Sequence, residues 1–171
     1  MHLRAGTGNM RSSAINRASP TMTQIYESAN FTISTPEHPH VARGDGGHLI
    51  INPNVTVEDR THLSRALAIE LMKLTMVAGE AMKTVLTRKG IEIRRINYQD
   101  NGNWRHELHV HLYGRARNAL VQTYGHPLSL PPTAQVFKEQ MGNLQPLLAE
   151  DIAGLKVEIM RLLASEKYRD F

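Results

Sequence analysis

Two histidines that lie two residues apart, His109 and His111, have the clearest chemical potential in this chain. Because alternate side chains of a β-strand share one face, a strand over residues 107–113 would place both imidazoles on the same side, roughly 7 Å apart. Glu107 would share that face, whereas His106 would not. The pair could bind a metal ion, attack a phosphorus atom, or be no more than ordinary strand surface.

Polar and basic residues near this strand favour a functional site. His48 begins another short apolar stretch directly after two glycines, where the backbone can approach a ligand closely. Arg105 and Arg115 flank the histidine strand, and a guanidinium matches phosphate geometry well. Neutral amides that can bond sugar hydroxyls and phosphate oxygens precede the strand: Asn97, Gln99, Asn101 and Asn103.

The elements that would position these residues predict an α+β fold with a largely antiparallel sheet. Apolar residues at steps of three and four indicate one long amphipathic helix from about residue 57 to 89, with Thr56 or Thr61 as its N-cap. Gly90 suits the position after its C-terminus. Short apolar stretches predict strands at 25–34, 48–53, 91–98 and 107–113, and Arg43–Gly47 is predicted to be a tight turn.

The chain is predicted to form one domain. Residues 1–22 lack apolar periodicity and are expected to be a flexible N-terminal tail. Residues 23–171 would form the domain, with a core at about 31–117 and a C-terminal helical extension at about 133–168 that packs on it. His38 and His40, which lie beside prolines, are interpreted as loop residues without a role.

Composition narrows the class of protein. The 171 residues include 20 basic and 16 acidic side chains and no cysteine, so disulfides and thiolate chemistry are excluded. The net charge of +4 suits an anionic ligand, but it is too small to predict a specific nucleic-acid partner. No apolar run approaches the roughly 20 residues of a membrane span, and the N-terminus is a poor secretory signal. We therefore expect a soluble cytoplasmic protein.

Four elements, in this order, resemble the histidine-triad (HIT) family of nucleotide hydrolases and transferases, whose motif is His-φ-His-φ-His-φ-φ with φ apolar. They are residues 47–51, the long helix, the amide-rich stretch 97–102, and the strand 107–113. The resemblance covers about Phe31 to Arg117. It implies a compact HIT-like fold, commonly homodimeric, that binds a purine nucleotide or dinucleotide. No cofactor would be required, although a divalent metal ion could accompany the substrate.

The resemblance also implies roles for residues. His109 would attack an α-phosphorus and form a nucleotidyl-histidine, His111 would contact the phosphate or leaving oxygen, and His48 would border the site. The substrate would be a dinucleoside polyphosphate or a nucleoside phosphoramidate. The residues expected to bind it are Asn97, Gln99, Asn101, Arg105 and Glu107.

The chain departs from the family pattern in two places. Glu107 stands where the first histidine of the triad is expected, and its carboxylate could hold an imidazole N–H or repel a phosphate. The usual Gly-Gln-Ser/Thr phosphate loop is absent, and the stretch 101–105 is shorter. Arg105 could take over phosphate binding, and Trp104 could cover the site or pack at a dimer interface.

Two other functions stay open. A nucleotide-binding or scaffold protein could keep the fold and have lost efficient turnover. Alternatively, His109, His111 and Glu107 could bind a metal ion, although the long helix between His48 and the histidine strand disfavours a metal-binding β-barrel.

Overall fold

The computed structural model describes residues 21–100, 102 and 104–171. Most of the predicted N-terminal tail therefore lies outside the described residues, and its last residue, Met22, already begins a strand. None of the helices in the described part of the chain is both long and apolar enough to cross a membrane.

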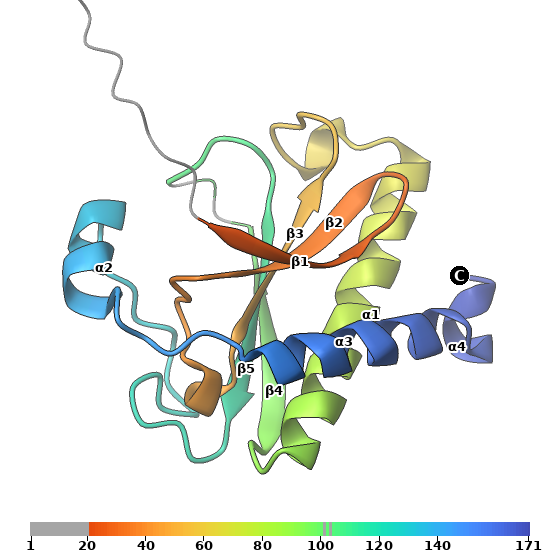
Figure 1. The fold of residues 1–171 in the computed structure, drawn as a ribbon. Helices are drawn as coiled ribbons and strands as arrows, with labels where there is room; N and C mark the ends of the chain where they lie inside the picture. The colour runs from red at the N-terminus through yellow and green to blue at the C-terminus, as the bar shows by residue number, and fades with distance from the viewer. Residues whose placement is uncertain (1–20, 101, 103) are drawn as a thin grey trace, which may run out of the picture.

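A five-stranded antiparallel sheet in the order β1-β2-β3-β5-β4 forms the centre of the molecule (Figure 1). The predicted α+β class is confirmed. One predicted strand was misplaced: the histidine strand begins at Val110, so Glu107 and His109 precede the ladder. The strands are β1 (Met22–Glu27), β2 (Phe31–Pro36), β3 (His48–Pro53), β4 (Ile93–Gln99) and β5 (Val110–Ala116).

The long helix α1 (Arg65–Arg88) begins later than the sequence pattern predicts. The reason is local competition for hydrogen bonds. The Asp59 carboxylate accepts from the main-chain N–H and the hydroxyl of Thr61. Asp59 is thereby the N-cap of a separate short 3-10 helix, Arg60–His62, that precedes α1. Ser64, and not Thr56 or Thr61, is the N-cap of α1, because its hydroxyl accepts from the Leu67 N–H.

The C-terminal region contains three helices instead of one continuous extension. They are α2 (Ala134–Met141), α3 (Ala149–Leu163) and α4 (Glu166–Arg169). Pro146 lies between α2 and α3 and has no N–H for a helical hydrogen bond. Leu155 and Ile159 of α3 are fully buried in the same core as α1.

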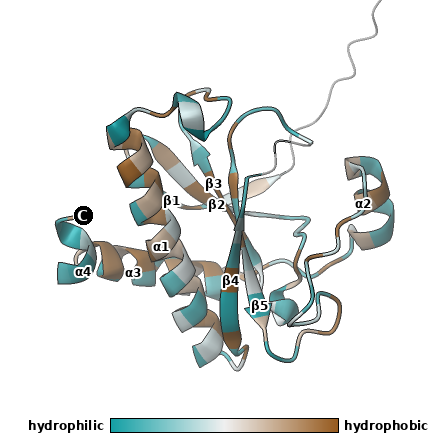
Figure 2. Ribbon diagram, turned by 180° about the vertical axis from the view of Figure 1, so that it is seen from behind, coloured by the Kyte–Doolittle hydropathy of each residue, from teal (hydrophilic) through white to brown (hydrophobic). Residues whose placement is uncertain are grey.

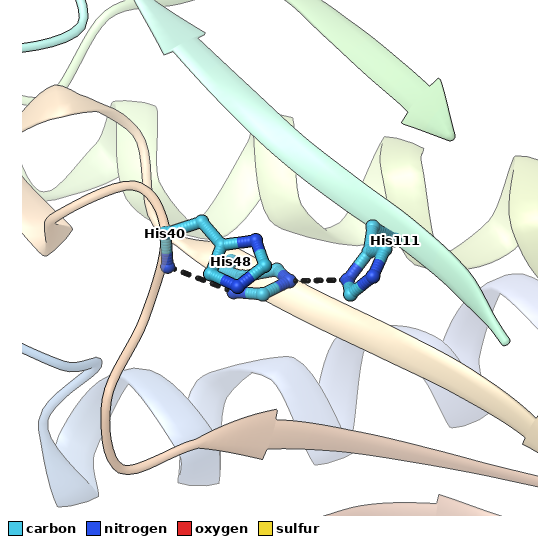
Figure 3. A group of neighbouring side chains, drawn as sticks. All are labelled: His40, His48 and His111. Atoms are coloured by element: carbon cyan, nitrogen blue, oxygen red, sulfur yellow. Dashed lines mark hydrogen bonds between the residues drawn. The ribbon is translucent and has the colours of Figure 1, made fainter. Parts of the chain in front are cut away.

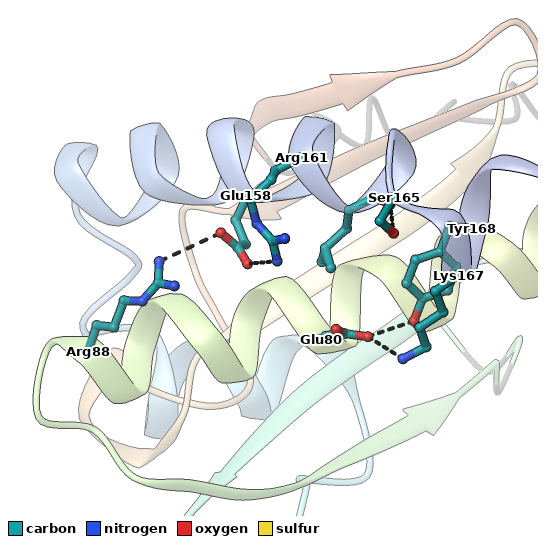
Figure 4. Close-up of polar contacts among 8 residues, drawn as sticks. Glu80, Arg88, Glu158, Arg161, Ser165, Lys167 and Tyr168 are labelled. Atoms are coloured by element: carbon teal, nitrogen blue, oxygen red, sulfur yellow. Dashed lines mark hydrogen bonds and ion pairs between the residues drawn. The ribbon is translucent and has the colours of Figure 1, made fainter.

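Polar contacts secure α3 and α4 against α1 (Figure 4). The Glu80 carboxylate accepts from the Tyr168 hydroxyl at 2.8 Å and from the Lys167 ammonium at 2.6 Å. Glu158 of α3 lies between Arg161, at 2.7 Å, and Arg88 of α1, at 3.6 Å. Helices α3 and α4 are thus part of the domain core and lie outside the site.

The two faces of the sheet carry different layers. Both ribbon views place α1 on one side of the sheet and α2 on the other (Figures 1 and 2). In Figure 2, hydrophobic and hydrophilic residues alternate around α1, as an amphipathic helix on a core requires. Leu108, Val110 and Leu112 are buried in the core that contains α1, as their predicted alternation requires. His111 of β5 therefore faces the side of α2.

A close approach of two glycines joins the start of β3 to β5. A Cβ atom on Gly114 would lie 2.0 Å from the main-chain oxygen of Gly46, and one on Gly46 would lie 2.3 Å from the oxygen of Gly114. Gly114 also donates its N–H to the Gly47 oxygen at 3.1 Å. Only glycine fits at this crossing, because the colliding atoms are backbone atoms that cannot rotate away.

We expect Gly114→Ala to destabilise the protein by about 3 kcal/mol, because the added methyl group must push the loop before β3 away from β5. Chemical denaturation monitored by circular dichroism measures this change. Gly44→Ala is the matched control in the same loop, since its Cβ meets nothing within 4 Å and its φ is not positive. It should change the free energy of unfolding by less than about 0.5 kcal/mol. Equal effects of the two substitutions would contradict the glycine crossing.

Candidate active site

His109 is held in one orientation and one tautomer by the main chain. Its Nδ1 lies 2.7 Å from the main-chain oxygen of Glu107, so Nδ1 carries the proton and donates it. Its Nε2 is then left with a lone pair, which is the state of an imidazole that can act as a nucleophile. Only 8% of His109 is exposed. The predicted acceptor behind this ring is thus a carbonyl group, which any residue at position 107 would supply.

A chain of hydrogen bonds orients His111 in the opposite sense (Figure 3). The His40 N–H donates to Nδ1 of His48 at 3.1 Å, which leaves the His48 proton on Nε2. His48 Nε2 lies 2.8 Å from Nδ1 of His111 and donates to it. The His111 proton is therefore on Nε2. The site thus contains one imidazole with a lone pair, His109, and one with an N–H donor, His111, whose ring centroids are 4.7 Å apart.

The strand pairing explains why these side chains meet. His48 of β3 pairs with Tyr113 of β5, and Gln99 of β4 pairs with His111. Directly paired residues of an antiparallel sheet point to the same face. The face opposite α1 therefore gathers side chains from three neighbouring strands, which lie far apart in the sequence.

Burial keeps the imidazoles neutral. It lowers the pKa of His111 to about 2 and that of His40 to about 4, and His109 contributes to both shifts. Burial also lowers the pKa of His48 and that of His109, although the hydrogen bond to the Glu107 carbonyl opposes the shift at His109. At neutral pH the site consequently presents uncharged nitrogen atoms.

Aromatic side chains cover the histidines. The His40 ring lies 4.8 Å from the ring of Phe137 in α2 and 5.4 Å from that of Trp104, between centroids. Its Nδ1 is 2.8 Å from the hydroxyl of Tyr113. Trp104 donates to the main-chain oxygen of Pro132 at 3.4 Å, which links it to the segment before α2. Of the two sequence-based possibilities for Trp104, the described contacts are those of a cover.

Buried charges hold the segment that follows β5 in place. Asp45 accepts from three successive main-chain N–H groups at residues 120–122, at 2.7 to 2.9 Å. These hydrogen bonds join the loop before β3 to the segment that follows β5. Arg115 donates to main-chain oxygens of Gln122, Thr123 and His126, so this arginine serves structure at this edge.

Some of the predicted substrate-binding residues lie beside His109, and Asn97 is instead bonded to Arg115. Arg105 and Glu107 lie beside His109, with Arg105 donating to Asn52 at 2.6 Å and lying 3.9 Å from the half-exposed Glu107 carboxylate. Asn97 accepts from Arg115 at 2.8 Å. Asn101 lies outside the described residues.

A cavity of about 320 Å³ opens beside His109. His106 lines the same cavity and pairs with Glu58 at 3.0 Å. Four carboxylates line this cavity, which we call the acidic cavity; they are Glu58, Asp59, Asp100 and Glu107.

His40 is the site residue that sequence reasoning missed. It was interpreted as a loop residue without a role, yet its ring contacts His48, His111 and Tyr113. Phe137 was missed as well. No local pattern marks either residue. His40 lies in a loop whose course depends on distant contacts, and Phe137 reaches the site on α2, whose position also depends on tertiary contacts. Their positions could only come from the tertiary structure.

The HIT domain family model matches residues 22–118. The chain belongs to the HIT domain family. The match ends just after β5, so α2, which carries Phe137 onto the site, lies beyond it. No curated protein matches the chain significantly.

Solved structures of histidine triad proteins share the fold at low identity. A protein from Sinorhizobium meliloti has a TM-score of 0.59 and 17% identity, over 83% of this chain and 90% of that one. One from Bradyrhizobium japonicum has a TM-score of 0.58 and 13% identity, over 82% and 89%. One from Marinobacter aquaeolei has a TM-score of 0.57 and 17% identity, over 83% and 88%. These similarities establish the HIT fold.

Proposed function

We propose that this HIT protein hydrolyses or transfers a nucleotide at its α-phosphate through a nucleotidyl-histidine on His109. The observation that supports this most directly is the hydrogen bond from His109 Nδ1 to the Glu107 carbonyl, which leaves Nε2 for attack. In the first step Nε2 forms a bond to the α-phosphorus, and the bond to the leaving group breaks. In the second, water or another acceptor displaces the histidine and takes the nucleotide.

His111 complements this nucleophile. Its Nε2–H, fixed by His48, can donate to a phosphate oxygen whose negative charge grows during the transfer. Arg105, beside Glu107, is a cation whose charge acts on His109, and its guanidinium suits a phosphate oxygen. No step in this reaction requires a bound cofactor, although a divalent ion could enter with the nucleotide.

The acidic cavity favours one class of leaving group. Four carboxylates would repel a bare polyphosphate, whereas an amine or a metal-chelated phosphate would be attracted. We therefore rank nucleoside phosphoramidates first, and dinucleoside polyphosphates with a divalent ion second.

The test is to detect the covalent intermediate. The protein is mixed with adenosine phosphoramidates and with diadenosine polyphosphates, with and without Mg²⁺, quenched under alkaline denaturing conditions, and digested for mass spectrometry. We expect a nucleotide mass on the peptide that contains His109. Nucleotide binding without any adduct or product would instead support the alternative, a nucleotide-binding protein of the same fold. The enclosure of His109, only 8% exposed, is the observation that favours this alternative.

We further propose a homodimer formed through α1 and β4. Strand β4 is an edge of the sheet, and its Tyr98 is 46% exposed. Met72 and Met76 of α1 are exposed by 50% and 37%. They border a hollow of about 380 Å³ whose lining is mostly apolar. Such an edge strand and apolar surface are features that a symmetric partner would cover.

Met72→Glu is therefore expected to weaken dimerisation at least about tenfold, because it buries a carboxylate at the interface without a partner. Sedimentation velocity over a concentration series measures the change. Val157→Glu is the control, since it places the same charge at a valine of α3 that is 64% exposed. The proposal fails if wild type is monomeric throughout the series, or if both variants dissociate alike.

A further inference from the structure

Three imidazoles converge at the centre of the site, and their arrangement has a second use. His40 comes from the loop before β3, His48 from the start of β3, and His111 from β5 (Figure 3). One nitrogen atom of each lies within 4.8 Å of the others. We call these residues the three-histidine cluster. Of the three metal ligands suggested by the sequence, His111 belongs to this cluster, whereas His109 and Glu107 do not.

The chemistry of the cluster suits a transition-metal ion. Neutral imidazole nitrogens are good ligands for zinc, copper, nickel and cobalt, whereas magnesium and calcium prefer oxygen. His48 is 1% exposed and His111 is 7% exposed, so no bulk water competes for these two ligands. The Tyr113 hydroxyl, 2.8 Å from His40 Nδ1, is a polar neighbour that can orient the third ring as a hydrogen bond does in metal sites.

The distances define what binding requires. Three nitrogens around a tetrahedral zinc ion, at about 2.0–2.1 Å from it, lie about 3.3 Å from one another. His48 Nε2 and His111 Nδ1 are 2.8 Å apart and share one proton, so the ion would take the place of that proton. His40 must approach the pair, and ring rotation in a loop residue provides this movement.

Binding also rearranges one proton. Without a metal ion, Nδ1 of His48 accepts the His40 N–H at 3.1 Å. When His48 Nε2 becomes a ligand, the proton of the ring moves from Nε2 to Nδ1. That hydrogen bond must open, and the loop carrying His40 must shift. His40 thus supplies both the third ligand, through its ring, and the hydrogen bond that opens, through its main-chain N–H. Metal binding is therefore coupled to the position of the loop that carries His40.

We propose that His40, His48 and His111 form a three-histidine site for a divalent transition-metal ion of the zinc type, with the fourth position open to water or a phosphate oxygen. The bound ion takes the place of the hydrogen bond that orients His111, and it leaves the His111 proton on Nε2. Metal binding does not depend on the proposed function.

The test uses the full chain, without an affinity tag and freed of metal by chelation. Zn²⁺ is titrated by calorimetry, and Co²⁺ is titrated by visible absorption, which distinguishes tetrahedral from octahedral coordination. We expect one ion per chain and a tetrahedral spectrum. His40→Ala should weaken binding at least about 100-fold, because a direct ligand contributes no less than an outer-sphere partner does. His111→Ala should weaken it similarly.

Two histidine variants serve as matched controls. His38→Ala removes an exposed histidine from the same loop, and His109→Ala removes the nearest imidazole outside the cluster. Both should bind Zn²⁺ as wild type does. The proposal is overturned if no saturable binding occurs, if the cobalt spectrum is octahedral, or if His40→Ala binds as tightly as His38→Ala. Because binding is read without turnover, an inactive protein would refute the proposed reaction and leave this result intact.

Discussion

Replacement of His109 by alanine is expected to lower the rate of nucleotidyl transfer on the order of 10⁴-fold or more, since the variant lacks the atom that attacks phosphorus. The fold should persist, because the residue precedes β5 and its only described hydrogen bond is to the adjacent Glu107 carbonyl. Steady-state kinetics with the best substrate of the panel measures the loss in kcat/KM. A melting temperature close to that of wild type would exclude unfolding as the cause.

His62→Ala is the control for this experiment. His62 is exposed and lies in the short 3-10 helix before α1, so its removal should leave kcat/KM unchanged. Nucleotide affinity should change little in His109→Ala, because the nucleophile is neutral and its main interaction with phosphorus forms during the reaction. If His109→Ala retained most of the wild-type rate, the nucleotidyl-histidine mechanism would be wrong.

Substitution of Asp151 by asparagine is expected to destabilise the protein by about 3 kcal/mol, because two partly exposed cations would lose the buried carboxylate that they share. Asp151 is fully buried, with Arg43 at 2.6 Å and Lys89 at 3.2 Å, and it also accepts the Leu148 N–H at 2.8 Å. This residue joins α3 to the loop that leads into β3. Glu150→Gln is the matched control, since Glu150 is 66% exposed and lies 4.0 Å from Lys89.

The effect of Asp151 should depend on pH in a defined direction. Burial alone would raise the pKa of Asp151, but the Arg43 guanidinium, the Leu148 N–H and the Lys89 ammonium together hold it below the usual value. A depressed pKa in the folded state means that the carboxylate stabilises the fold above the unfolded pKa, about 3.9, and that this stability is lost as the pH falls below it.

Urea denaturation at pH 7 and at pH 3 tests this expectation. The difference in the free energy of unfolding between wild type and Asp151→Asn should be largest at pH 7 and should shrink at pH 3. A difference that is the same at both pH values would show that Asp151 acts through packing and not through its charge.

Glu107, which the sequence resemblance places at the first position of the triad, contacts His109 through its main chain and not through its side chain. Its main-chain oxygen accepts the His109 proton, while its side chain is half-exposed and directed toward Arg105. A residue of any type offers the same carbonyl. The variant residue therefore changes the charge of the acidic cavity without disturbing the orientation of His109.

Local patterns determined much of the fold. The alternation of residues 107–113 placed Leu108, Val110 and Leu112 in the core because the period of two is a property of the extended backbone itself. The recurrence of apolar residues at steps of three and four identified α1, because that period is a property of the helical backbone. Gly90 follows the end of this helix with a φ of +83°, as predicted. The predicted start of the long helix was less accurate, because Asp59 and Ser64 each cap a different helix. A few hydrogen bonds from these two side chains decide where each helix begins.

By itself, the sequence determined the family resemblance and the pairing of His109 with His111 on one face, because both depend on spacing along one strand. Only the tertiary structure decided what holds those rings: the Glu107 carbonyl behind His109, and the hydrogen bonds through His48 behind His111. It alone brought in His40, since that contact depends on the path of a loop fixed by buried partners more than 100 residues away, such as Asp151 with Arg43. Long-range contacts of this kind leave no periodic trace in the chain, because their partners are chosen by packing and not by sequence separation.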